Sequence, residues 1–495
     1  MTNLSLMMLS MFAVLAPHDS RVVPNAYIVR LDPGLCAVQL VSTAEAVAYD
    51  TGGQMGYIYH HAFKGFAIEL PPEVPIQALE NRPHVIGVEP VRKVELFSQE
   101  IPTGVLRMNA HRCPIANING IDQRVDVGVA VIDTGIQPDH PDLNVVGGAR
   151  FFPHQTGPFT QVRDDGNFED EDGHGTHVAG IIGALDNDFG VVGVAPGAQL
   201  WALKVFNELG ESTDTRLVNA ALDWVVPRRD DIQVVNMSLG GTGNVPSLRQ
   251  AIQSVVNAGI VVVAAAGNNS RDIYGDDGVF GTSDDTFPAS YPEVMTISAL
   301  VDYDGEPGGT DNNTSWGLDD SFANFSNYSN HVVADNPVDS PGAAIDLMMP
   351  GTRIYSTDIN SSYSFNSGTS MAAPHAAGLV ALYIAANGRA NNAQEVYAIR
   401  QALIDSASPQ NSPRGLAVQN DRDDFPEPIG YIIPADLNYD GRVDMQDLAI
   451  LLDNWLSVSG DDAFCRRCDL ALPPDGVINL PDIAEFAQHW LVGYD

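Results

Sequence analysis

The central part of this chain is predicted to adopt an α/β fold with a doubly wound, mostly parallel sheet, flanked by two smaller units. From about Val127 to Ala407, short β-branched apolar runs alternate with longer segments of helical period. Such alternation is typical of a parallel sheet covered by helices. A length of 495 residues corresponds to about three domains at roughly 150 residues each. The composition, 44% hydrophobic and 18% charged residues, is that of a packed globular protein.

The elements of this central part follow from period and length. Strand candidates are apolar on both faces, as a doubly covered sheet requires, and helix candidates repeat apolar residues at three- and four-residue spacing. The predicted strands are Val127–Asp133, Ala202–Phe206, Ile232–Leu239, Ile260–Ala266 and Val294–Ala299, and the predicted helices are Gly175–Leu185, Thr213–Val226, Ser247–Ala258, Ser370–Ala386 and Ala393–Ser406.

The flanking segments define the remaining domains. The amino-terminal part is predicted to be a small α+β unit, and the last sixty or so residues contain two short amphipathic helices. Residues from Ser412 to Pro434 are rich in Pro, Asp and Asn and are predicted to be a linker. The predicted boundaries are 1–16 for a leader, 25–97 for the α+β unit with strands near Ala26–Leu31, Val47–Asp50, Ala67–Leu70 and Gly87–Pro90, 98–411 for the central domain, 412–433 for the linker and 434–495 for the carboxyl-terminal unit.

The amino terminus favours secretion. Leu4 to Ala16 is an apolar run of signal-peptide length, with small residues at Val14 and Ala16. No Lys or Arg precedes the run, so a misassigned start or a plain buried segment remains an alternative. No other stretch has the ~20 uninterrupted apolar residues that span a bilayer, so we expect a soluble mature chain.

The charge balance excludes some classes of partner. The chain has 63 acidic and 25 basic residues, a net charge of −38, so nucleic acid and anionic membrane surfaces are unfavourable partners and cations are favourable ligands. Four cysteines are too few for a disulfide scaffold. Cys465 and Cys468 are close enough in sequence for a local disulfide, with free thiols as the alternative to it, and no second pair lies in reach to complete a zinc site.

Three short motifs place polar residues where the pattern is otherwise structural. Asp133 lies in Val-Ile-Asp-Thr-Gly at the carboxyl end of a predicted strand, where open α/β sheets bind ligands. His174, in Asp-Gly-His-Gly-Thr-His, and Ser370, in Gly-Thr-Ser-Met-Ala-Ala-Pro, lie at the starts of predicted helices. Acyl transfer needs a hydroxyl nucleophile, an imidazole that takes its proton and a carboxylate that orients the imidazole. Pro374, which we place near the first turn, should cost little there.

These motifs, in the order Asp, His, Ser, resemble those of the subtilisin-like serine proteases (subtilases), and the similarity runs from about Ser98 to Ala407. It implies that Ser370 is the nucleophile, His174 the general base and acid, and Asp133 the orienting carboxylate. His177, one turn further on, is expected to be structural.

The resemblance extends to the substrate-binding residues. Asn268, in Ala-Ala-Ala-Gly-Asn, corresponds to the family's side-chain donor to the tetrahedral intermediate. Ser238, Leu239 and Gly240, at the end of a predicted strand, resemble the segment whose main chain pairs with the peptide substrate.

The unit at 25–97 resembles the inhibitory prodomain of the same family, with a permanent accessory domain as the alternative. The resemblance implies autoprocessing before Ser98, with Val94 to Phe97 bound in the active-site groove of the precursor. Phe97 then predicts a preference for large apolar residues before the scissile bond, although an intramolecular cut tolerates a poor sequence.

Calcium is the expected cofactor, because it takes six to eight oxygen ligands and the chain is rich in them. For the first site, described next, the alternative is a plain surface loop that binds no calcium. A site resembling the family's tight calcium site is expected from the side chains of Gln99, Asp142 and Asn187 and the carbonyls of Leu185, Phe189 and Val191.

The carboxyl-terminal unit has a second type of calcium motif. Oxygen-bearing side chains stand at positions 1, 3, 5, 9 and 12 of a loop with Gly at position 6, as in an EF-hand but closed by Asp, and a helix follows at once. This pattern resembles a dockerin repeat, which implies a cohesin-like partner. The residues of the loop are Asp436, Asn438, Asp440, Arg442, whose carbonyl is the ligand, Asp444 and Asp447.

Two further acidic segments are ambiguous. A second copy of the loop ends at Asp482, but Pro473 stands where a ligand is needed and Asp469 is two residues too early, so a structural loop is an equal alternative. The Asp-rich stretch Arg271–Thr286 is either a solvated loop or another ion site.

Two other functions compete with secreted proteolysis. One is a non-catalytic binding module recognised through the carboxyl-terminal unit, and it is compatible with an active protease. The other is an esterase, which is disfavoured because the nucleophile lacks the Gly-x-Ser-x-Gly elbow.

Overall fold

The computed structural model divides the chain into two compact units, Met1–Leu96 and Phe97–Asp495, which are described separately. The predicted leader at 1–16 and the segment Val94–Phe97 lie outside the described residues. The described residues are 22–80, 82–92, 98–156, 159–164, 166–210, 213–308, 315–333, 335–412, 421–438, 442–459, 465–471 and 476–490.

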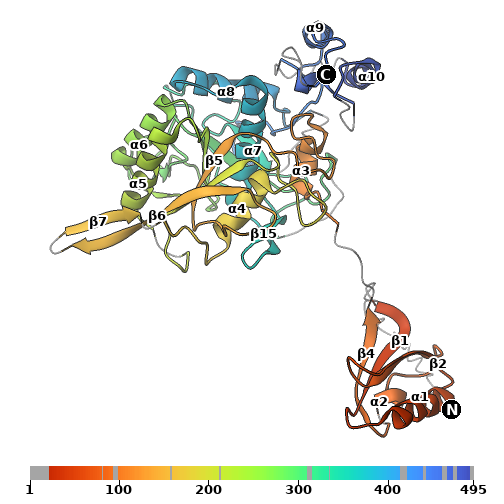
Figure 1. Ribbon diagram of the computed structural model, residues 1–495. Helices are drawn as coiled ribbons and strands as arrows, with labels where there is room; N and C mark the ends of the chain where they lie inside the picture. The colour runs from red at the N-terminus through yellow and green to blue at the C-terminus, as the bar shows by residue number, and fades with distance from the viewer. Residues whose placement is uncertain are drawn as a thin grey trace, which may run out of the picture. The chain divides into compact units, whose positions relative to one another are not determined.

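The amino-terminal unit packs helix α1 (Ala37–Thr51) against an antiparallel sheet (Figure 1). The predicted strand Val47–Asp50 is wrong, because these residues lie in α1. Leu40, Ala44 and Val47 are buried at helical spacing, a period that four residues alone are too few to display. The sheet has the order β2 (Gln54–Tyr59), β3 (Gly65–Glu69), β1 (Val22–Leu31) and β4 (Val85–Arg92), and a short helix α2 (Gln77–Glu80) precedes β4.

The second unit is built on an eight-stranded sheet that is parallel except for the β6–β7 hairpin. The five predicted strands are all present, with ends that differ from the predicted ones by no more than three residues. Strands β6, β7 and β14 were not predicted, because β6 is interrupted by Gly and Pro and β14 is short. The sheet order is β14 (Leu347–Pro350), β13 (Met295–Leu300), β11 (Val261–Ala265), β9 (Val234–Met237), β5 (Gly128–Asp133), β8 (Gln199–Lys204), β6 (Val145–Thr156) and β7 (Phe159–Asp164).

Helices form two pairs around this sheet (Figure 1). Helix α4 (His174–Gly183) packs against α7 (Thr369–Asn387), and α5 (Thr215–Val225) packs against α6 (Pro246–Asn257). Among the described residues, α7 is the one helix long and apolar enough to cross a membrane, but 78% of its apolar window is buried in the protein. Its composition therefore fits the central helix of a packed core. Helix α8 (Ala393–Ser406) has its predicted bounds.

Part of the predicted linker 412–433 is packed against the catalytic sheet. Ile429 is fully buried and forms bridges to Met348 and Ser408, and the Ile432 N–H donates to the Met108 carbonyl at 2.9 Å. The Pro- and Asp-rich composition hid a short apolar segment that the sheet edge can pair with.

The carboxyl-terminal segment has two short helices, α9 (Met445–Asp453) and α10 (Leu480–Gln488), with a hydrophobic core of their own. Leu451 and Phe486 contribute one buried side chain from each helix. Cys465 and Cys468 form a disulfide, as one of the two sequence alternatives proposed.

Candidate active site

Asp133 and His174 are joined by a hydrogen bond at the carboxyl edge of the sheet. Asp133 is the last residue of β5, and its carboxylate is 1% exposed. His174 is the first residue of α4, and its Nδ1 lies 2.7 Å from Asp133 Oδ1. The Thr134 N–H donates to the same oxygen at 2.8 Å. The carboxylate therefore holds the imidazole in one orientation, with Nε2 directed away from Asp133.

The start of α4 is held in place by a carboxylate that sequence analysis did not single out. Asp170 accepts from the N–H groups of Gly173 and Thr176, at 3.0 and 2.9 Å, and from the Thr176 hydroxyl at 2.6 Å. These bonds satisfy N–H groups that a helix start leaves unpaired. A Cβ at Gly175 would lie 2.1 Å from the Gly135 carbonyl oxygen, so only glycine permits the close approach of helix and strand.

The surrounding carboxylates change the basicity of His174. Burial by itself lowers the pKa of His174, but the charge and hydrogen bond of Asp133, with the charges of Asp172 and Asp170, outweigh burial and raise the pKa to about 9. The neutral imidazole, which can accept a proton, therefore predominates in alkaline solution. By contrast, burial lowers the pKa of His177 to about 4.

His177 has a structural environment. Its side chain is fully buried, and Nε2 lies 3.1 Å from the Ile354 carbonyl and 3.2 Å from the Ser364 carbonyl. These carbonyls belong to the hairpin of β15 (Ile354–Asp358) and β16 (Ser362–Asn366). His177 thus fastens α4 to that hairpin.

Ser370 lies in the first turn of α7 and bonds reciprocally with Ser238. The Ser370 hydroxyl donates to the Ser238 carbonyl at 3.3 Å, and the Ser238 hydroxyl donates to the Ser370 carbonyl at 2.8 Å. Within the described residues, the Ser370 hydroxyl makes no hydrogen bond to His174. Catalytic hydrogen bonds often tighten only when substrate is bound.

The expectation for Pro374 needs correction. Pro374 is the sixth residue of α7, beyond the first turn, so its missing N–H leaves the Ser370 carbonyl without the usual helical donor. The Ser238 hydroxyl takes the place of that donor. The proline is therefore tolerated because a neighbouring strand end replaces the lost bond.

Asn268 is oriented by the residue before Ser370. Asn268 Oδ1 accepts from the Thr369 N–H at 2.9 Å and from the Thr369 hydroxyl at 2.8 Å. With its oxygen held in this way, the amide presents its two N–H donors on the other side. Asn268 was predicted from the sequence, whereas Thr369 was not. The available signal was a polar residue at the start of a predicted helix, where polar residues are common.

A cavity of about 330 Å³ adjoins these residues. Ser370 and Asn268 lie at its edge, and the predicted substrate-binding residues Ser238, Leu239 and Gly240 line one side. Short strands β10 (Gly241–Thr242) and β12 (Thr286–Phe287) pair next to it. The cavity thus brings Ser370 and Asn268 together with the predicted substrate-binding residues, while Asp133 and His174 are joined to each other by their hydrogen bond.

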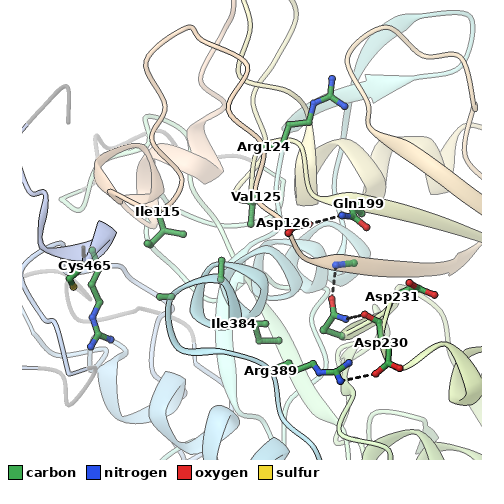
Figure 2. A pocket seen from close by; sticks show the side chains of 15 residues that line it. Ile115, Arg124, Val125, Asp126, Gln199, Asp230, Asp231, Ile384, Arg389 and Cys465 are labelled. Carbon is green, nitrogen blue, oxygen red and sulfur yellow. Dashed lines mark hydrogen bonds and ion pairs between the residues drawn. The ribbon is translucent and has the colours of Figure 1, made fainter. Parts of the chain in front are cut away.

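A larger cavity, of about 760 Å³, lies at the opposite edge of the sheet (Figure 2). It is lined by Gly128 and Gln199, which begin β5 and β8, whereas Asp133 ends β5. Figure 2 shows Arg389 paired with Asp230, with Arg389 Nη2 2.7 Å from Asp230 Oδ1. Because α/β sheets bind ligands at the carboxyl ends of strands, the smaller cavity is the candidate active site.

The predicted ligands of the first calcium site converge. Asp142 is fully buried, and Asn187 Nδ2 donates to its Oδ1 at 2.9 Å. Gln99 Nε2 donates to the carbonyls of Leu185 and Val191 at 2.6 and 3.2 Å. Burial raises the pKa of Asp142 to about 6. A buried carboxylate with backbone carbonyls and two side-chain amides is a donor set that fits calcium once each amide turns its oxygen toward the ion.

Phe189, the sixth predicted ligand, lies in the same loop. Its N–H donates to Asn187 Oδ1 at 3.0 Å, which shows the turn that would direct its carbonyl.

In the carboxyl-terminal unit, Asp440 and Gly441 lie outside the described residues, whereas the other predicted ligands are described. Asp447 is fully buried and accepts from the N–H groups of Leu437, Asn438 and Asp444 at 2.7, 3.1 and 2.9 Å. Asp436 is buried, and Asp444 caps α9 by accepting from Gln446 N. Arg442 lies on the same loop, between Asp436 and Asp444.

In the second loop, Asp482 occupies a position similar to that of Asp447 in the first. Asp482 is fully buried and accepts from Ala471 N at 2.9 Å and Asn479 N at 2.7 Å. Asp469 accepts from Gly476 N at 2.8 Å.

The remaining acidic segments differ in arrangement. In the Asp-rich loop, Asp272 accepts from Asn330 N at 2.9 Å and contacts His331 Nδ1 at 3.1 Å. A group not singled out from sequence, Asp302, Asp304 and Asp319, has carboxylate oxygens within 4.8 Å of one another.

Comparisons with known proteins show which families the chain resembles. The model of the subtilase family matches residues 125–430, and that of peptidase inhibitor I9 matches residues 26–97. Subtilisin E of Bacillus subtilis (strain 168) is 36% identical over 322 residues, covering 65% of this chain and 71% of that protein. M-protease of Shouchella clausii (strain KSM-K16) is 37% identical over 342 residues, covering 69% and 73%. A crystal structure of a cold adapted subtilisin-like serine proteinase has 28% sequence identity and a TM-score of 0.46, covering 64% of this chain and 98% of that one.

The chain therefore belongs to the subtilase family and has an inhibitor I9 prodomain. It is a serine endopeptidase.

Proposed function

We propose that Ser370, His174 and Asp133 act as the catalytic triad of this endopeptidase. His174 Nε2 takes the proton of the Ser370 hydroxyl as its oxygen attacks the scissile carbonyl, and then gives the proton to the leaving amine. The acyl group is then an ester on the Ser370 oxygen. Water gives a proton to His174 and attacks this ester, which releases the acid product and restores the Ser370 hydroxyl. The observation that carries the proposal is the 2.7 Å bond between His174 and Asp133, taken together with the cavity that Ser370 and Asn268 line.

Asn268 is the side-chain donor to the oxyanion in this proposal. Its oxygen is occupied by Thr369, so the amide N–H groups are free to donate to negative charge that develops on the substrate oxygen. The N–H of Ser370, in the first turn of α7, is the second donor, because helix starts leave N–H groups unpaired.

The peptide substrate is proposed to pair with the main chain of Ser238, Leu239 and Gly240 as an added strand. Leu239 and Ala265 supply apolar walls to the adjoining cavity, which supports acceptance of a large apolar residue before the scissile bond. Phe97 would be that residue during autoprocessing of the precursor.

Hydrolysis of casein, with the variant Ser370→Ala as control, tests the activity. Activity in the wild-type protein alone is expected, and equal activity in both proteins would refute the triad. Intact-mass measurement of the secreted protein tests processing: cleavage before Ser98 in the wild type and an uncut precursor in the variant are expected.

Calcium is proposed as a structural cofactor held by Gln99, Asp142, Asn187 and the carbonyls of Leu185, Phe189 and Val191. The supporting observations are the buried carboxylate of Asp142 and the carbonyls within reach of the Gln99 amide. Bound calcium would supply a positive charge for that carboxylate and would tie Gln99, near the new amino terminus, to the loop.

The carboxyl-terminal unit is proposed to be a dockerin-like calcium-binding domain that tethers a secreted protease to a cohesin-like partner. Support comes from the repeated arrangement around Asp447 and Asp482 and from the shared core of α9 and α10. A pull-down with immobilised cohesin domains should recover the full chain in calcium and lose it in chelator. Recovery in neither condition would contradict the tethering role and leave a unit whose helices only pack against each other.

A further inference from the structure

We propose that Arg271 makes the primary specificity pocket a site for glutamate, so that the protease cleaves after Glu as well as after large apolar residues. The inference rests on the proposed function, because it concerns the same cavity. Arg271 lines that cavity together with Ser370 and Asn268. It was considered in sequence analysis only as the first residue of an acidic stretch.

The guanidinium is fixed across the two short strands next to the nucleophile. Arg271 Nη2 donates to the Thr242 hydroxyl at 2.8 Å and to the Thr286 hydroxyl at 3.1 Å. Thr242 and Thr286 face each other in the β10–β12 pair, and both line the cavity. The arginine is therefore held by neutral hydroxyl groups that leave its charge unneutralised.

Arg271 is short of partners for its remaining donors. Its Nε is buried and has no hydrogen-bond partner, and the guanidinium forms no ion pair within the part of the chain that the structure describes. This is unusual in a protein with 63 acidic and 25 basic residues, where most arginines have a carboxylate available. An unpaired buried donor is costly unless a ligand satisfies it.

A glutamate side chain supplies the negatively charged acceptor that these donors lack. A carboxylate can accept from Nη1, the guanidinium nitrogen that neither threonine engages, and such charge-assisted bonds are roughly twice as strong as neutral ones. The methylene groups of glutamate would lie along Leu239 and Ala265, which also line the cavity. A lysine before the scissile bond would bring a second positive charge to Arg271 and is disfavoured.

The same pocket remains open to aromatic residues. An aromatic ring can stack on the flat face of a guanidinium, so Arg271 is compatible with a Phe such as Phe97. The distinguishing property is therefore the ratio between glutamate and its uncharged isostere glutamine.

The test uses peptides that differ only at the residue before the scissile bond, which is Glu, Gln, Phe or Lys, and compares kcat/KM at fixed ionic strength. For the wild-type enzyme, kcat/KM should be about tenfold or more higher for Glu than for Gln, because a hydrogen bond to a charged group contributes more than one to a neutral group. In Arg271→Gln this ratio should fall to about one, with the Phe peptide changed by less than about threefold.

Control variants and peptides separate an effect on substrate preference from an effect on folding and from the electrostatic field of the whole protein. Arg271→Lys keeps the charge without the fork and should retain part of the Glu preference. Arg216→Gln removes a charge from the exposed surface of α5 and should leave all ratios unchanged. A peptide with Glu far from the scissile bond reports repulsion by the acidic protein as a whole.

The two possible failures are distinguishable. Equal Glu-to-Gln ratios in the wild type and Arg271→Gln, with good cleavage of the Phe peptide, would overturn the role of Arg271 and leave the protease assignment intact. Absence of cleavage of every peptide and of casein would instead overturn the proposed triad. If Arg271→Gln fails to fold, the ratio in Arg271→Lys and the wild-type preference decide the matter.

Discussion

Ser238 and Ser370 exchange hydrogen bonds in both directions: the Ser238 hydroxyl donates to the Ser370 carbonyl at 2.8 Å, and the Ser370 hydroxyl donates to the Ser238 carbonyl at 3.3 Å. Pro374 is the reason the first bond is needed, because it lacks the N–H that would otherwise satisfy that carbonyl. The pair connects the helix that carries the proposed nucleophile to the segment proposed to bind the peptide.

Replacing Ser238 with alanine should therefore impair both stability and turnover. The Ser370 carbonyl would lose its donor, at a cost of about 1 kcal/mol or more in the free energy of unfolding, and a displaced nucleophile should lower kcat by about tenfold. Thermal unfolding and steady-state kinetics measure the two effects, with the exposed Ser254→Ala on α6 as control.

The double variant Ser238→Ala/Pro374→Ala sharpens this test. Alanine at 374 restores the N–H, so part of the lost stability should return in the double variant. If Pro374→Ala changes stability equally with and without Ser238, the proposed compensation between the two residues is wrong.

Asn268→Ala should lower kcat by about 10²- to 10³-fold with KM nearly unchanged, the range known for loss of the side-chain oxyanion donor in subtilisin itself. Asn268→Asp is the matched isostere and should be at least as inactive, because it replaces donors by a negative charge. A proportional rise in KM for either variant would instead indicate a role in ground-state binding.

In a plot of kcat/KM against pH, the rising limb should lie at alkaline pH. The pKa of His174 is raised to about 9 by neighbouring carboxylates, and only the neutral imidazole accepts the Ser370 proton, so kcat/KM should rise with pH up to that region. Asp172→Asn removes one of these charges and should move the limb to lower pH. Asp223→Asn, on the exposed side of α5, controls for net charge.

The sign for stability is opposite to that for activity. Because the folded pKa lies above the ordinary value of 6.5, the paired imidazolium stabilises the fold fully below pH 6.5, and this contribution is lost as the pH rises through about 9. Unfolding measurements on the wild type and His174→Ala across this range check it. A stability difference between them that grows with pH would contradict the charge pairing.

Calcium removal should lower the thermal midpoint, and Asp142→Asn should abolish most of that calcium dependence. Burial raises the pKa of Asp142 to about 6 in the structure without metal, and calcium binds the deprotonated carboxylate, so affinity should weaken as the pH falls through about 6. Calcium titrations at pH 8 and pH 5.5 measure this change in affinity. Asp188→Asn removes an exposed charge from the same loop and should retain calcium dependence.

Local patterns in the sequence were enough for the class of fold and the catalytic residue types. All five strands predicted in the catalytic domain are present, because continuous apolar runs such as Val129–Ile132 are buried on both faces. Helix α8 has its predicted bounds because Asn392 caps its start through Glu395 N, a signal readable in the sequence. Prediction failed where pairing with distant partners decided the outcome, as at Ile429 and β14.

The sequence by itself determined that a hydroxyl, an imidazole, a carboxylate and an amide stand at strand and helix ends, since these depend on motifs of a few residues. Only the tertiary structure decided that Asp170 caps the helix of His174, that Ser238 replaces the bond lost at Pro374, and that Arg271 lines the same cavity as Ser370. The physical reason is that these contacts join residues far apart in the chain, and hydrogen-bond geometry exists only after the core has packed.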